Sequence, residues 1–159
     1  MATRTTEVDL PPLDLGTVPE VADVNVLPDW EVGTPGVLCA AGPHAIPVST
    51  ALRAGDHTIL MALSQQRETF DILRHDPRAA FCLMGAGIAF SAYGMASVKR
   101  QELAVARGVA AVEIEVDRVQ DHLADGRTDL IAGARWRWRT DRLVEDEQAI
   151  IDELIKLAL

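Results

Sequence analysis

The sequence is short of cysteine and of long apolar runs, and each shortage excludes a class of protein. The chain has 159 residues and only two cysteines, Cys39 and Cys82, which lie far apart inside apolar runs. That spacing is not a disulfide framework, and it predicts two buried free thiols in a reducing compartment. No apolar run approaches the roughly 20 residues that cross a bilayer, and the N-terminal residues have no continuous apolar stretch typical of a secretory signal. We therefore expect a soluble, cytoplasmic protein.

The sequence also has few basic residues. Lys and Arg together number 15 against 24 Asp and Glu, which gives a formal net charge of −9. A domain this acidic repels phosphate backbones and anionic lipid surfaces. We therefore expect neither nucleic acid nor a membrane as a partner, whereas the net charge says nothing about small-molecule binding.

Motifs of several large enzyme families are missing. Gly85-Ala86-Gly87 begins like a dinucleotide fingerprint, but Phe90 stands where the third glycine is needed, so these glycines predict a hairpin turn. The sequence contains neither a phosphate-binding P-loop nor a GxSxG nucleophile motif. No metal site is expected, because the histidines share no metal-ligand spacing; they are His44, His57, His75 and His122. The catalytic residues are therefore unknown at this stage.

Short apolar runs between turn residues are the main signal that is present, and they predict β strands. Pro47 interrupts one run, Gly55-Asp56 predicts a hairpin turn, and Gly94 predicts a bend or bulge inside a long strand. The predicted strands are residues 36–40, 44–53, 58–63, 79–84 and 88–99.

Two further segments alternate strictly between apolar and charged residues. Residues 112–117 alternate with acidic side chains, and residues 134–139 alternate with arginines. We expect these two strands to pair, with acidic and basic faces opposed and with Trp136 and Trp138 on the apolar, core side. Residues 120–130 are expected to form a polar loop or short helix between them.

Helical spacing occurs in two places, with a weaker signal near the N-terminus. Residues 65–74 predict a short middle helix with Ser64 as its N-cap, ended by Asp76-Pro77. A C-terminal helix is predicted by an apolar stripe that starts at Ile150, with the acidic residues 145–147 near the helix start. Residues 18–30 give a weak indication of another short helix, and Trp30 is interpreted as a packing anchor.

These elements predict a mainly β chain with helices, of the α+β class, in which six or seven antiparallel strands form a barrel. The helices are too few to separate the strands of a doubly wound parallel sheet. Residues 1–17 contain prolines and acidic residues and are expected to be a flexible N-terminal arm. Residues 18–159 are expected to form a single domain.

Polar side chains gather around the expected start of the middle helix. Arg67 offers a planar charged fork that suits phosphate, and a helix start offers free amides. A Ser-capped helix with solvated polar residues has the same pattern, so the residues alone leave both interpretations open. The candidate phosphate ligands are Ser64, Gln66, Arg67 and Thr69, with the strand hydroxyls of Ser49 and Thr50 nearby in sequence.

An ordered series of short motifs resembles the FMN-binding split barrel of the pyridoxamine 5′-phosphate oxidase superfamily. The resemblance covers residues 36–100 well and residues 109–140 loosely. Each motif is unspecific alone, and the order of the series carries the resemblance. The motifs are Gly42-Pro43-His44, Pro47-Val48, Asp76-Pro77-Arg78, and the spaced residues Gly94, Ala96 and Val98.

The resemblance implies a homodimer with FMN, or alternatively the deazaflavin coenzyme F-420, bound at two interfacial sites. The phosphate would lie near Ser64, Arg67 and Thr69. Trp136 and Trp138, or Arg137 and Arg139, would reach the partner's site. The flavin ring would be contacted by the strand residues Val48, Ser49, Thr50, Met61, Ala62 and Leu63.

The chain departs from the family pattern in two places. Glu68 and Thr69 stand where family members commonly carry a basic pair that grips phosphate, and the C-terminal motif of true pyridoxamine oxidases is absent. The split-barrel resemblance and the polar residues 64–69 support the first hypothesis, an FMN- or deazaflavin-dependent oxidoreductase that acts on an unidentified small molecule. The alternative is a non-enzymatic flavin or haem binder or carrier on the same fold, and a third possibility is a dimeric structural unit without a ligand.

Overall fold

The computed structural model describes residues 23–159. The predicted arm of residues 1–17 and the first part of the helix predicted at 18–30 lie outside the described residues. The assignment of residues 18–159 to one domain stays a prediction.

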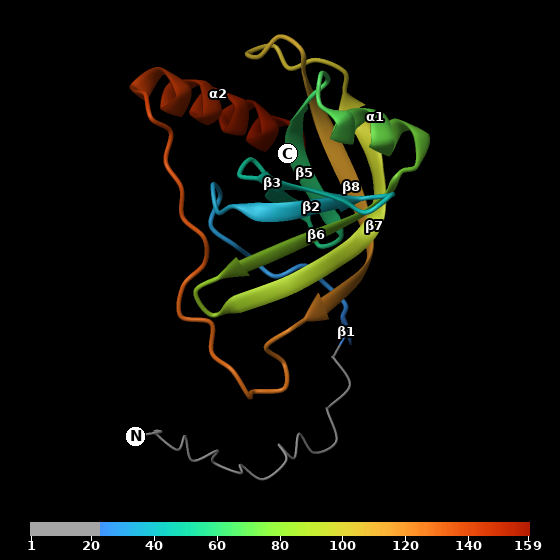
Figure 1. The fold of residues 1–159 in the computed structure, drawn as a ribbon, viewed down its shortest axis with the longest axis vertical. Coiled ribbons are helices and arrows are strands. Elements are labelled where there is room, and N and C mark those ends of the chain that lie inside the picture. The colour runs from blue at the N-terminus through green and yellow to red at the C-terminus, as the bar shows by residue number, and fades with distance from the viewer. Residues whose placement is uncertain (1–22) are drawn as a thin grey trace, which may run out of the picture.

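The described chain is an antiparallel sheet with two helices, so the predicted α+β class is confirmed (Figure 1). Eight strands form the sheet, one of which, β1, has only two residues. The helices are α1 (Glu68–His75) and α2 (Asp141–Ala158). The strands are β1 (Asp23–Val24), β2 (Gly36–Ala40), β3 (His44–Val48), β4 (Leu52–Gly55), β5 (Thr58–Ser64), β6 (Arg78–Gly85), β7 (Ile88–Arg100) and β8 (Val109–Asp121).

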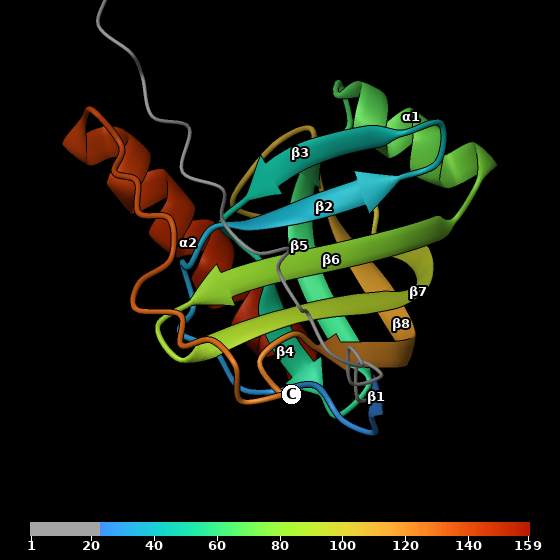
Figure 2. The same ribbon diagram turned by 60° about the horizontal axis from the view of Figure 1, so that its bottom comes forward.

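The strand order explains the shape of the sheet. The order is β3-β2-β6-β7-β8-β5-β4, with β1 paired to β8 outside this path. The two ends of the order, β3 and β4, follow each other in the chain and are separated by only three residues, 49–51. The sheet therefore curls until its ends approach (Figure 2), an arrangement consistent with a split barrel.

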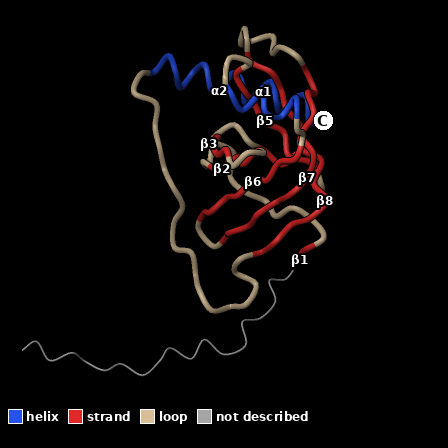
Figure 3. Tube along the Cα trace, turned by 45° about the vertical axis from the view of Figure 1, so that its right-hand side comes forward, coloured by secondary structure: helices blue, strands red, loops and turns tan. Residues whose placement is uncertain are grey.

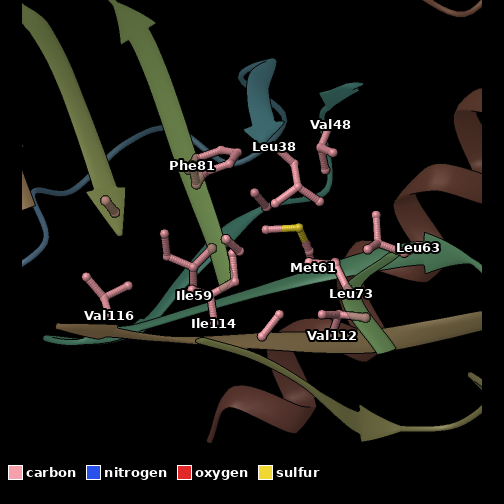
Figure 4. Close-up of a cluster of buried hydrophobic side chains, with 14 of the residues drawn as sticks. Leu38, Val48, Ile59, Met61, Leu63, Leu73, Phe81, Val112, Ile114 and Val116 are labelled. Carbon is pink, nitrogen blue, oxygen red and sulfur yellow. The ribbon is translucent and has the colours of Figure 1, made fainter. Parts of the chain in front are cut away.

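The core lies inside the curled sheet, into which alternate side chains of strands such as β5 and β8 point (Figure 4). Leu38, Ile59, Met61, Phe81 and Ile114 are fully buried there. These are the apolar positions of the predicted strands, so burial of this face determines the register.

Trp30 closes one side of this core, as expected of a packing anchor. Its ring centroid lies 6.2 Å from that of Phe81 and 5.4 Å from that of Phe90. Its indole Nε1 donates to the carbonyl oxygen of Ala51 at 3.1 Å, which satisfies the one polar atom of the ring.

Helix α2 covers part of the outer face of the sheet. Leu154 is buried against a second cluster that includes Leu60 of β5 and Ala111 of β8, whereas Ile155 is 42% exposed. The predicted apolar stripe is therefore only partly used for packing. The helix begins at Asp141, with Thr140 as N-cap, so the acidic residues 145–147, which were expected near its start, lie just beyond its first turn.

Gly94 forms the predicted irregularity in β7. The register with β8 shifts between Tyr93 and Gly94. A Cβ atom at Gly94 would overlap the carbonyl oxygen of Glu115, so only glycine fits this close approach. The hairpin predicted at Gly55-Asp56 is also confirmed, because β4 and β5 pair across it.

The strand predicted at 134–139 is wrong. Residues 128–138, here called the strap, contain no helix or strand and run outside the barrel from β8 to α2 (Figure 3). The expected partner, β8, already pairs with β7 along one edge and with β5 and β1 along the other, so no edge is left. Trp136 and Trp138 are consequently 46% and 41% exposed and are not core residues.

Two helix predictions also need correction. Residues 23–30 contain no helix, because Asp23 and Val24 pair with β8. The middle helix exists but starts at Glu68, and Ser64 is not its N-cap. Ser64 is still paired with Val109 as the last residue of β5, and Arg67 holds the cap position without a side-chain hydrogen bond.

Within residues 23–159, neither helix is long and apolar enough to cross a membrane.

Candidate functional site

The two segments predicted to contact the flavin ring lie side by side. The hydroxyl of Thr50, just before β4, accepts the backbone N–H of Ala62 at 3.0 Å and lies 3.4 Å from the carbonyl oxygen of Ala62. This contact joins the link between β3 and β4 to the middle of β5. The structure therefore brings together residues that are 12 positions apart in sequence.

Strand alternation divides the predicted ring contacts into two groups. Val48, Met61 and Leu63 are buried in the core inside the sheet, so only their backbone is available to a ligand outside it. Thr50 and Ala62 are half-buried on the outer side, where Ala62 packs against the cluster under α2.

Ser49 is buried and bonded to Glu147, which the sequence predicted as part of the C-terminal helix but not as a site residue. Its Oγ donates to Oε1 of Glu147 in α2, and Nε1 of Trp138 donates to Oε2 of the same carboxylate at 2.8 Å. Two predicted cofactor residues thus meet on one side chain. No local sequence pattern predicts this contact, because Ser49 and Glu147 are 98 positions apart.

The predicted phosphate ligands lie at the turn between β5 and α1. The N–H of Gln66 donates to Oγ of Ser64 at 3.3 Å, and the N–H of Arg67 donates to the carbonyl oxygen of Ser64 at 3.1 Å. The side chains of Gln66 and Arg67 are exposed. This turn therefore presents one guanidinium and one amide group to solvent directly before the helix.

Two carboxylates lie directly after this turn, at the start of α1. Glu68 and Asp71 occupy the first turn of α1, where they oppose a bound anion. The Glu68 side chain is 79% exposed and its Oε2 lies 4.0 Å from Nδ1 of His44.

Thr69 points inward. It is 1% exposed, and its Oγ1 lies 2.7 Å from Nε2 of His44 at the start of β3. This hydrogen bond fastens α1 to the sheet and was missed by the sequence reasoning. The Thr69 hydroxyl thus already has a hydrogen-bond partner within the chain. Its role as a phosphate ligand stays a prediction.

The strap carries the remaining two predicted residues. The ring centroids of Trp136 and Trp138 lie 6.3 Å apart, and together with Arg137 they line a hollow of about 120 Å³. The strap is fixed to the hairpin between β6 and β7, because the N–H of Gly87 donates to the carbonyl oxygen of Leu130 at 2.8 Å.

The remaining histidines and the two cysteines form no metal site or reactive site among residues 23–159. His57, His75 and His122 are exposed, and no cluster of three metal-ligating side chains occurs within residues 23–159. Both cysteines are free and half-buried. Burial, together with the nearby Cys82, raises the pKa of the Cys39 thiol, which keeps it protonated and unreactive.

Comparison with known proteins finds similarity only at the level of structure. No protein-family model matches the chain, and no curated protein matches it significantly. Three similar solved structures are a candidate pyridoxamine 5′-phosphate oxidase from Lactobacillus delbrueckii, an FMN-binding protein from Syntrophomonas wolfei and a haem-binding protein from Mycobacterium smegmatis.

The similarity to these three structures is distant. The first has 12% identity and a TM-score of 0.49, with 60% of this chain and 94% of that chain covered. The second has 12% identity and a TM-score of 0.44, with 58% and 78% covered. The third has 18% identity and a TM-score of 0.49, with 76% and 56% covered. At these values, no residue role or activity of this chain follows from the similarity.

Proposed function

We propose that this chain binds a flavin-type cofactor, FMN or alternatively the deazaflavin coenzyme F-420, along β5 and the start of α1. One observation carries the proposal: Thr50 bonds to Ala62, so the two predicted ring-binding segments form one surface. That surface continues along β5 to the exposed Gln66 and Arg67.

The donor groups suit a ring with one phosphate attached. Arg67 would hold the phosphate by charge-assisted hydrogen bonds, with Gln66 and the free amides of the α1 start as further donors. The outer atoms of Thr50 and Ala62 would contact the ring. Glu68 lowers the affinity for an anion, so we expect a weaker grip on phosphate than a basic pair would give.

The proposed activity is that of an oxidoreductase acting on an unidentified small molecule. A bound flavin or deazaflavin would supply the hydride chemistry. The role of the chain itself is to bind the ring and to orient it. The catalytic residues stay unknown.

The proposed assembly is a homodimer with the cofactor between the subunits. The strap supports it, because Trp136 and Trp138 expose apolar rings beside arginines 135, 137 and 139. Exposed aromatic and Arg side chains are typical of interfaces. In a dimer these residues would reach the partner's cofactor site.

Titration of the purified chain with FMN and with F-420 tests the proposal. We expect cofactor fluorescence to change on binding and Arg67→Ala to weaken binding about tenfold or more, since a hydrogen bond to a charged group contributes about 1.5–3 kcal/mol. Arg74→Ala is the matched control, because Arg74 is exposed at the other end of α1. The proposal would be overturned if the unmodified chain bound neither cofactor. It would also be overturned if Arg67→Ala and Arg74→Ala changed the cofactor affinity equally.

The oligomeric state is measured separately by light scattering after gel filtration. We expect a dimer, and a combined Trp136→Ala and Trp138→Ala variant is expected to dissociate more readily. A monomer that binds the cofactor with full affinity would reject the interfacial site and leave the flavin-binding surface in place.

A non-enzymatic flavin or haem carrier is the second candidate, and Glu68 is the observation that favours it. A carboxylate beside Arg67 suits reversible binding better than a permanently held cofactor. Haem binding would show as a Soret band that is lost when His44, His57, His75 and His122 are replaced by Ala. A Soret band that survives the fourfold replacement would exclude histidine ligation.

A further inference from the structure

A cavity of about 690 Å³ lies at the end of the barrel opposite α1. Its walls come from the hairpin between β6 and β7, from the loop before β2 and from the end of β8. Figure 1 shows this hairpin and α1 at opposite ends of β6 and β7. The cavity is therefore separate from the proposed flavin surface.

The interior of the cavity is apolar and of a suitable size for a ligand. Val26, Trp30 and Ile88 line it with accessible side chains, whereas Leu83 and Phe90 border it but are almost completely buried. Small-molecule sites commonly have volumes of about 300–1,000 Å³ and mainly apolar or aromatic walls. An apolar body of drug-like size thus fits this space.

The polar lining of the cavity has one sign of charge. Among residues 23–159, Asp29, Glu31 and Asp121 line the cavity, and no Lys, Arg or His does. Asp29 is paired with Arg53 at 3.4 Å. Glu31 and Asp121 have no ion-pair partner within residues 23–159, although one oxygen of Asp121 accepts the N–H of Leu123 at 2.9 Å.

We propose that this cavity binds a small organic cation with an apolar body, such as an arylalkyl amine. The carboxylates of Glu31 and Asp121 attract the positive group and repel an anion of the same shape. Trp30 adds an aromatic surface, which favours a cation over a neutral ligand of equal size. This inference is independent of the proposed flavin binding.

A matched pair of probes tests it: 4-phenylbutylamine and 4-phenylbutyrate share an apolar body and carry opposite charge. The three tryptophans give three indole N–H signals in a ¹⁵N-labelled sample, assigned with single Trp→Phe variants. We expect the amine to shift the Trp30 signal and leave those of Trp136 and Trp138 in place. We expect the acid to bind about tenfold more weakly or not at all.

Two substitutions separate shape from charge. Ala86→Phe, at the exposed turn that lines the cavity, is expected to weaken binding of the amine about fivefold by filling space. Ala124→Phe is its control, since Ala124 is exposed and does not line the cavity. Glu31→Gln combined with Asp121→Asn is expected to remove most of the preference for amine over acid, whereas Glu145→Gln on the far helix is expected to retain it.

The proposal is overturned if the amine and the acid bind equally to the unmodified chain, or if neither binds. It is also overturned if the amine shifts only Trp136 and Trp138, because binding then takes place on the strap. Unchanged binding in a folded Ala86→Phe variant would likewise exclude the cavity as the site.

Discussion

Trp138 donates its indole N–H to Oε2 of Glu147 at 2.8 Å, and this bond fastens the strap to α2. The other oxygen of the same carboxylate accepts the hydroxyl of Ser49 from the link between β3 and β4. One side chain thus holds three separate segments together beside the proposed flavin surface. Glu147 therefore determines how the strap and α2 border that surface.

Glu147→Ala is expected to destabilise the fold by about 1–3 kcal/mol, because buried Ser49 loses its hydrogen-bond partner and Trp138 loses a charged acceptor. Urea unfolding followed by circular dichroism measures the change. Glu145→Ala is the control, since Glu145 is exposed on the same helix and is expected to change stability by less than about 0.5 kcal/mol. Equal stabilities for the two variants would show that the Glu147 contacts contribute nothing.

The sheet was largely predictable because burial of one face requires apolar residues at alternate positions of each strand. Apolar residues at every second position of residues 112–117 are the buried side of β8, and Gly94 marks the place where β7 approaches Glu115 too closely for a side chain. The strap has the same alternation without the burial. Alternation predicts a strand only where a neighbouring edge is free, and pairing of β8 with β1, β5 and β7 is a property of the whole sheet.

The candidate site was predictable in part for the same reason. Thr50 lies just before β4 and Ala62 lies in β5, and a short hairpin joins these two strands, so the proximity of the two residues follows from local turn chemistry. The bonds of Glu147 to Ser49 and of Thr69 to His44 join segments 98 and 25 positions apart. No local sequence pattern encodes such contacts, because they depend on how α1 and α2 pack against the sheet.

Gly94→Ala is expected to cost about 2–4 kcal/mol, because its Cβ would overlap the carbonyl oxygen of Glu115 and force β7 away from β8. Thermal unfolding measures the effect. Met95→Ala, at the next and 48% exposed position, is expected to have little effect. If Gly94→Ala unfolds with the same midpoint as the unmodified chain, the close approach of the two strands is incorrect.

Thr69→Val tests whether Thr69 holds the fold, a ligand or both. Loss of its hydrogen bond to His44 is expected to cost about 1 kcal/mol in urea unfolding. If the resemblance also assigns phosphate binding correctly, the folded variant binds FMN more weakly. If Thr69 only fastens α1, FMN affinity stays unchanged. Thr58→Val in β5 is the control, because the Thr58 side chain makes no hydrogen bond within residues 23–159 and lies in a strand, where Val is favoured.

Glu153 is the polar anchor of the C-terminal half of α2. The buried carboxylate accepts Nη1 of Arg100 at 2.9 Å and the backbone N–H groups of Ala104 and Val105 at 2.9 and 3.0 Å. Burial raises the pKa of Glu153, but the two amides and Arg100 outweigh it, so the pKa in the fold lies below the usual value. The ionised form is therefore the one that stabilises the docked helix.

This pKa shift predicts how stability depends on pH. A carboxyl whose pKa is lowered by folding contributes fully above its unfolded pKa of about 4.5 and loses that contribution as the pH falls through the lower, folded pKa. Glu153→Gln cannot ionise, so it is expected to be less stable by about 1–3 kcal/mol at pH 7, and the gap is expected to shrink as the pH falls below about 4.5. Urea unfolding of both proteins between pH 3 and 7 measures this, with Glu145→Gln as the exposed control on the same helix. A gap that is constant across this range would show that the charge of Glu153 does not hold α2 in place.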